Sequence, residues 1–317
     1  MDFDPMNKKH ILSFLLLLLL LPAGCTKEDN RNCPAGLYVC FEPNNPKHNY
    51  QELVTQVDLY FYGADGELKA DFHYSRNDLR THDRAAFVPR MPAGEYKLVA
   101  VVNSGKDYET YGIENYETLY TKVKQDIVSD KLTDFFTSEK QITVGRPASL
   151  VQTETLKLAK HNNNIRLKIL YDNYTAPPNT VLDAFVEESC GHIYYSTYSG
   201  PPTRDVRYLP WNELSGSDGL PLQFDISTFR LWIGSDAALC LREADAVSGI
   251  DAGRFYTLNI TDALVTVKNA AGEFLYDTDE KLEYNDEYEI TITIGKDFVI
   301  LSVTIDNWDI ISGGVVV

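Results

Sequence analysis

The chain of 317 residues lacks an excess of positive charge, clustered histidines and cysteines, and the common catalytic motifs. It holds 29 Lys and Arg against 46 Asp and Glu, a net charge of -17, which argues against a nucleic-acid partner because phosphate binding needs clustered positive charge. The histidines and cysteines are too scattered for a zinc site. The metalloprotease, phosphate-loop, nucleophile-elbow and dinucleotide motifs are missing. The sequence therefore predicts no enzyme, no metal site and no cofactor.

Cysteine usage leaves the redox state open. Apart from Cys25, four cysteines allow three disulfide pairings: Cys33, Cys40, Cys190 and Cys240. A turn could bring Cys33 and Cys40 together, whereas a straight strand would hold them about 20 Å apart. Cys190 and Cys240 are predicted to be small buried thiols. The six histidines are predicted to be mostly exposed to solvent.

The N-terminal region contains one short hydrophobic run that leads to a cysteine. Seven leucines, Leu15 to Leu21, are typical of a signal peptide and too few for a membrane-spanning helix, which needs about 20 apolar residues. The run, followed by small residues and Cys25, resembles a bacterial lipoprotein signal in which Cys25 carries the covalent lipid. Pro22 stands where that signal usually has leucine, and an ordinary secretory signal is the alternative. Met6 is predicted as the true start, because the residues before it are acidic.

The residues after Cys25 predict a polar tether, residues 25–32, between the lipid and the fold. Lys27-Glu28-Asp29 resembles the export tag of lipoproteins that face outward from the outer membrane of Gram-negative anaerobes. This resemblance implies a surface-exposed outer-membrane lipoprotein.

The rest of the chain is rich in tyrosine and in short alternating runs, which is typical of β-structure. Residues 57–61 predict a half-buried strand, and residues 96–102 are apolar enough for a central strand. Gly66 is expected to supply the positive φ of a turn, and a similar turn is predicted at residues 269–272. A hairpin is predicted over residues 289–305. Further strands are predicted at 37–41, 68–74, 142–144, 151–158, 165–169, 191–198, 224–233, 237–242 and 255–260, and around Val265 and Val267.

Two segments are predicted to interrupt this pattern. Residues 114–136 carry apolar side chains at helical spacing, which predicts an amphipathic helix packed on a sheet. Residues 201–220 predict a long loop that contains Trp211, whose ring could stack on a sugar or plug the end of a sandwich. The polar run at 161–164 predicts a domain boundary. The prediction is an all-β protein of two antiparallel β-sandwich domains, residues 33–160 and 161–317, after a signal peptide at residues 1–24.

Several motifs resemble the FimB-type family of lipoprotein fimbrial anchors. They begin with Cys33 to Val39 and continue with residues 57–68, the turn at 92–96, the segment 163–167, residues 228–231 and the late Trp308. The resemblance implies two tandem transthyretin-like domains and a non-catalytic subunit at the base of a fimbrium. It also implies that stalk subunits join by donor-strand exchange.

The apolar C-terminus fits such a strand. The predicted polymerisation residues are Val303, Ile305, Trp308, Ile310, Val315, Val316 and Val317. The alternative is that this segment completes the chain's own second sandwich. Two other functions remain open: a tip or accessory fimbrial adhesin, and a glycan-binding surface lipoprotein that uses Trp211.

Overall fold

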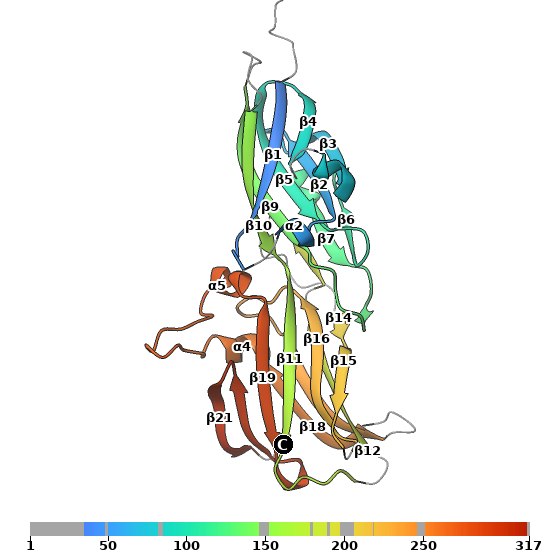
Figure 1. Cartoon of the computed structure of the whole chain (residues 1–317), viewed down its shortest axis with the longest axis vertical. Helices are drawn as coiled ribbons and strands as arrows, with labels where there is room; N and C mark the ends of the chain where they lie inside the picture. Colours follow the sequence, from blue (N-terminus) through green and yellow to red (C-terminus); the bar gives the residue numbers. More distant parts are fainter. Residues whose placement is uncertain are drawn as a thin grey trace, which may run out of the picture.

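Two blocks of β-sheet follow one another along the long axis of the molecule (Figure 1). The computed structural model describes residues 35–315 except 48–49, 82–84, 146–151, 178–179, 189–190, 197–205, 218 and 246–250. Cys25, Cys33, Cys190, Val316 and Val317 lie outside the described residues. The prediction of a nearly all-β protein is confirmed.

The first block is a seven-stranded sheet that folds over on itself. In spatial order its strands are β3 (Leu68–Ser75), β2 (Gln56–Tyr62), β5 (Gly94–Val102), β9 (Phe136–Val144), β10 (Gln152–Lys160), β1 (Ala35–Pro43) and β4 (Ala86–Met91). β9 and β10 pair at only two described positions, so the sheet divides there into two layers. The outermost strands approach each other, because Tyr74 Oη donates to the Phe87 carbonyl at 2.9 Å. Two short helices, α2 (Tyr50–Leu53) and α3 (Arg76–Arg80), accompany these strands.

A second, three-stranded sheet covers the other face of β2 and β5. Its strands are β13 (His192–Tyr194), β7 (Tyr120–Val123) and β6 (Tyr108–Tyr111). Leu98 and Ala100 of β5 lie in the core between the two layers, whereas Val99 lies in the core under the small sheet. The prediction of a central strand at residues 96–102 is confirmed. The strand predicted at 57–61 is present as β2. The prediction that only one of its faces is buried is wrong, because the small sheet also covers Tyr60.

The second block is a sandwich of two sheets. One sheet has the order β15 (Pro210–Ser215), β16 (Pro221–Phe229), β11 (Asn162–Tyr171), β19 (Glu287–Ile294), β20 (Ile300–Ile305) and β21 (Trp308–Val315). The other has the order β18 (Asp251–Asn259), β17 (Ala238–Asp245), β12 (Thr180–Glu188), β14 (Val206–Tyr208) and β8 (Ile127–Val128). Helices α4 (Ile260–Leu264) and α5 (Asp279–Tyr284) and the 3-10 turns η2 (Tyr116–Thr118) and η3 (Lys296–Phe298) complete the described elements. Alternating residues such as Leu167, Ile290 and Ile292 are fully buried between the sheets.

The chain crosses between the two blocks more than once. β10 of the first block leads directly into β11 of the second (Figure 1), and His161 lies between them in the chain. Strands are also exchanged across this point. β8 precedes His161 and pairs with β14, whereas β13 follows it and pairs with β7. One buried cluster therefore contains apolar residues from both blocks.

The predicted amphipathic helix over residues 114–136 is wrong. The structure has η2, β7 and β8 in its place. Burial in β7 alternates, with Thr121 and Val123 inward, and Ile127 is 57% exposed. A short apolar run is compatible with the spacing of a helix and with that of a strand. Here the backbone hydrogen bonds of β7 to β6 and β13 stabilise a strand.

Three smaller predictions also need correction. The long loop predicted at 201–220 contains strands β14 and β15. Val265 caps helix α4 instead of lying in a strand. Two of the three histidines in the described part are buried, His161 and His192, although the histidines were expected to be mostly exposed. Cys240 is a buried free thiol, as predicted, and Cys40 is a partly buried free thiol.

Candidate functional site

The C-terminal strand β21 forms one edge of the six-stranded sheet. It pairs antiparallel with β20 alone among the described strands, from Ile305 opposite Trp308 to Ile300 opposite Val315. Its other side faces no described strand. A sheet edge of this kind offers unpaired main-chain groups, which is the geometry needed to pair with a strand of another chain.

The predicted polymerisation residues divide between the core and this edge. Val303 and Ile305 are fully buried members of β20 in the core of the second block. Trp308 is 37% exposed at the start of β21, and Ile310 packs partly against the core. Val316 and Val317 lie outside the described residues, and Val315 is described only by its backbone register.

A tight turn joins β20 to β21. Asp306 and Asn307 adopt positive φ angles of 49° and 71°, as a two-residue hairpin turn requires. The turn is held to β19, because the backbone N–H of Glu289 donates to Asp306 Oδ1 at 3.0 Å. Tyr276 Oη donates to Asp306 Oδ2 at 2.5 Å. The start of β21 is therefore fixed by side-chain contacts.

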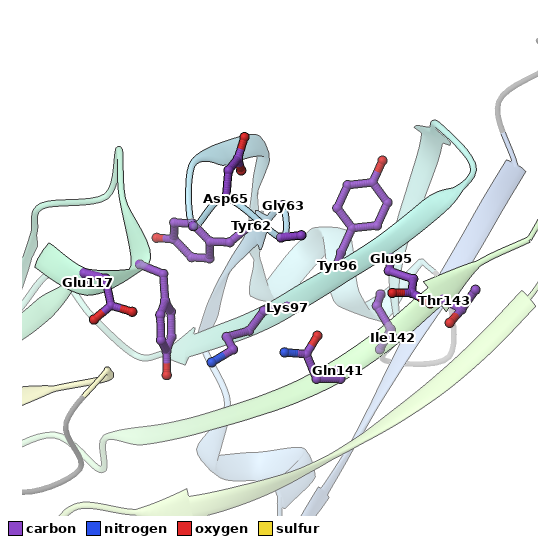
Figure 2. A pocket seen from close by; sticks show the side chains of 13 residues that line it. Tyr62, Gly63, Asp65, Glu95, Tyr96, Lys97, Glu117, Gln141, Ile142 and Thr143 are labelled. Carbon is purple, nitrogen blue, oxygen red and sulfur yellow. The ribbon is translucent and has the colours of Figure 1, made fainter.

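A hollow of about 660 Å³ lies on the surface of the first block (Figure 2). The turn that carries Gly63 and Asp65 lies on one side of it, and Lys97 and Gln141 of the neighbouring strands β5 and β9 lie opposite. Gly66 has a φ of +76°, so the predicted positive φ at this turn is confirmed.

The aromatic rings around this hollow are engaged in structural contacts. The hydroxyl groups of Tyr62 and Tyr96 donate to the carbonyls of Ile113 and Pro92. Tyr116 Oη donates to the Tyr195 carbonyl at 2.6 Å, and Lys97 Nζ lies 3.7 Å from the centroid of the Tyr116 ring. All three tyrosines are buried. They support the hairpin turn and expose little of their surface.

The described residues contain no group of three or more His, Cys, Asp or Glu side chains that could hold a metal ion. Within the same residues no helix is long and apolar enough to cross a membrane. The features of this molecule that stand out are its sheet edges and its elongated form.

The sequence matches a known protein family over most of its length. The model of the fimbrillin-A associated anchor proteins Mfa1 and Mfa2 matches residues 30–313. The chain belongs to this family. The resemblance to fimbrial anchors seen in the sequence is thereby confirmed. A comparison with curated protein sequences finds no match.

Solved structures of other anchors and adhesins share the fold. The fimbrial anchor protein Mfa2 from Porphyromonas gingivalis is 15% identical with a TM-score of 0.67, over 89% of this chain and 100% of that one. A Bacteroides thetaiotaomicron protein provisionally described as polysaccharide binding is 20% identical with a TM-score of 0.70, over 87% and 97%. A provisional adhesin from Bacteroides ovatus is 14% identical with a TM-score of 0.68, over 87% and 95%. Membership of this family makes the chain a fimbrial accessory protein associated with fimbriae at the cell surface.

Proposed function

We propose that this chain is the lipid-anchored base of a fimbrium, which attaches the stalk to the outer membrane and limits its length without catalysis. The observation that carries the proposal is the anchor-family match across nearly the whole chain, residues 30–313. We propose two tandem transthyretin-like sandwiches, residues 33–160 and 161–317, as its architecture.

The arrangement of the chain supports a tethered base. The first described strand, β1, begins at the end of the long axis that lies away from the second block (Figure 1). In the proposal, residues 1–24 are a signal peptide, and a lipid on Cys25 holds this end at the outer membrane through the tether at 25–32. The second block then points outward, where β21 can meet a stalk subunit.

We propose that a stalk subunit joins by donor-strand-type pairing at the C-terminal segment. The strand that exchanges is β21 with the residues named above from Trp308 to Val317, whereas Val303 and Ile305 stay in β20. The single partner of β21 among the described strands supports this, because only β20 has to release it.

The experiment that tests the anchor role is deletion of the gene, with cells and culture medium blotted for stalk protein. Fimbriae shed into the medium, and longer than usual, are expected for the base. Complementation with the Cys25→Ser variant should also release fimbriae, whereas the unmodified gene should retain them on cells. Fimbriae that stay attached after deletion would contradict the anchor role and favour a tip adhesin.

A disulfide lock tests the strand exchange separately. Ser302 and Ser312 are opposite each other in the β20–β21 register, so Ser302→Cys with Ser312→Cys would hold β21 on β20. We expect this double variant to lose stalk attachment and to regain it with reductant. The Ser302→Cys single variant is the matched control. Removal of Ser312 to Val317 should also abolish attachment, and attachment by the locked variant would contradict exchange of β21.

A further inference from the structure

A second hollow, of about 350 Å³, lies on the outer face of the six-stranded sheet in the second block. Its lining includes Trp211 from the edge strand β15, Asp225 from β16, Arg166 from β11 and Glu289 from β19. The volume falls in the range of about 300–1,000 Å³ that is usual for small-molecule sites. The hollow extends from the edge strand β15 across β16 and β11 to β19, and it reaches Asp306 in the turn between β20 and β21.

A β-bulge places the tryptophan in this hollow. The register of β15 against β16 shifts between Pro210, which pairs with Ile226, and Asn212, which pairs with Asp225. Trp211 is therefore the extra residue, and bulges of this kind redirect a side chain at a sheet edge. Trp211 is 38% exposed and lines the same hollow as Asp225. This contrasts with the buried tyrosines around the hollow of Figure 2.

A fixed polar network lies beside the ring. Asp225 is buried and accepts hydrogen bonds from Arg166 Nε at 3.0 Å, Asn212 Nδ2 at 2.7 Å and Gln223 Nε2 at 3.0 Å. These bonds hold the Arg166 side chain in place while it remains half exposed. Asn164 Oδ1, also part of the lining residues, is buried and has no hydrogen-bond partner among the described residues.

The charges in the hollow select against ionic ligands. The lining contains the cations Lys131 and Arg166 and the carboxylates of Asp225, Glu287, Glu289 and Asp306. The excess of carboxylates disfavours an anionic ligand. Lys131 Nζ already lies 5.3 Å from the centroid of the Trp211 ring, so a second cation on that face would meet a like charge.

An exposed ring beside fixed planar donors and acceptors fits a neutral polyol with one apolar face. We propose that this hollow binds a neutral sugar ring of a glycan chain, with the C–H face of the ring on Trp211 and its hydroxyls on Arg166 and the neighbouring carboxylates. The site adds a glycan-binding function to the second block and is independent of the anchoring role. The sequence predicted that Trp211 could stack on a sugar, but no pattern of neighbouring residues indicated that Arg166 and Asp225 would lie beside it.

The test uses the full folded chain and isothermal titration with neutral probes, namely hexasaccharides of glucan, mannan, galactan and xylan. We expect at least one to bind, and Trp211→Ala and Arg166→Gln each to weaken that binding by about tenfold or more. Phe255→Ala is the matched control, because Phe255 is exposed to nearly the same extent on β18, the edge strand of the other sheet, and does not line the hollow. It should leave binding unchanged.

Three results would overturn the proposal. The first is that none of the neutral hexasaccharides binds at millimolar concentration. The second is binding that Trp211→Ala leaves intact while circular dichroism shows the variant to be folded. The third is preferential binding of a lysine-rich peptide or of hyaluronan, which would assign the hollow to a charged ligand. Loss of fimbrial anchoring plays no part in this test, so the two proposals can fail separately.

Discussion

Lys160 Nζ lies 2.8 Å from Asp134 Oδ1 at the point where the two blocks meet. Its second partner is Asp286, which immediately precedes β19 of the second block. The Lys160 side chain is buried, and burial alone would lower its pKa, but the two carboxylates raise that pKa above its ordinary value. One ammonium group therefore connects Asp134 and Asp286, which are far apart in the sequence, at the junction between the two blocks.

The first prediction concerns this cation. Lys160→Met leaves two carboxylates together without their counter-charge, so the free energy of unfolding should fall by about 3–5 kcal/mol. Lys168→Met is the control, because Lys168 pairs with Glu289 at 2.7 Å on the exposed face and should cost less than about 1 kcal/mol. Urea unfolding followed by tyrosine fluorescence measures both. Equal losses in the two variants would contradict a special role for Lys160.

The second prediction concerns pH. His161 is fully buried, with Nε2 2.6 Å from Thr137 Oγ1. Burial, and secondly the charge of Arg230, hold its pKa well below the ordinary value. Between that lowered pKa and the unfolded value of about 6.5 the unfolded chain binds more protons, so stability should fall with decreasing pH by up to about 1.4 kcal/mol per pH unit.

His161→Gln should remove the histidine's contribution to the slope of the unfolding free energy against pH between pH 7.5 and 5.5. His73 provides a control of opposite sign, because its hydrogen bond with Asp58 raises its pKa. The stabilisation from His73 is present below the unfolded pKa and is lost as pH rises through the folded pKa, and solvent screening makes it small. His73→Gln should therefore make the acid slope slightly steeper. A slope unchanged by His161→Gln would contradict the prediction.

The third prediction concerns a glycine. Gly112 has a φ of +64°, and a Cβ there would lie 2.0 Å from the carbonyl oxygen of Thr118. Gly112→Ala should therefore displace the turn that carries Tyr116 and lower the melting temperature. Gly234→Ala is the matched control, because Gly234 has a φ of +79° and no atom of the described residues lies within 4 Å of a Cβ added there. Only the backbone cost of about 1–2 kcal/mol therefore applies. Similar losses in both variants would show that the turn yields to the added methyl group.

The fourth prediction concerns thiol reactivity. Burial, and secondly the charge of Glu187, raise the pKa of Cys240 to about 11, so little thiolate exists at pH 8. Cys40 also has a raised pKa but is partly exposed. Iodoacetamide at pH 8, with site-by-site mass spectrometry, should label Cys40 well before Cys240. Unfolding in urea should make the two equally reactive, and early labelling of Cys240 in the folded chain would contradict its burial.

Local patterns predicted much of the fold. The alternation of isoleucines in β19 and the apolar run of β5 identified their strands, because one residue step turns a side chain to the opposite face. Gly66 and Gly272 both have positive φ, as expected for their turns. The segment 114–136 failed because its short apolar pattern fits a helix as well as strands, and the neighbouring strands decided between them.

The sequence by itself determined many of the strands, the turns at Gly66 and Gly272 and the resemblance to the family, because each depends on residues close together in the chain. The tertiary structure alone decided the burial of Lys160 against Asp134 and Asp286, the hollow of Trp211 with Arg166 and Asp225, and the exchange of β8 and β13 between the blocks. Lys160 and Asp286 are 126 residues apart, and no local period encodes such a meeting. Only the packing of whole sheets brings these side chains together, because strand order is set by hydrogen bonds and burial across the entire fold.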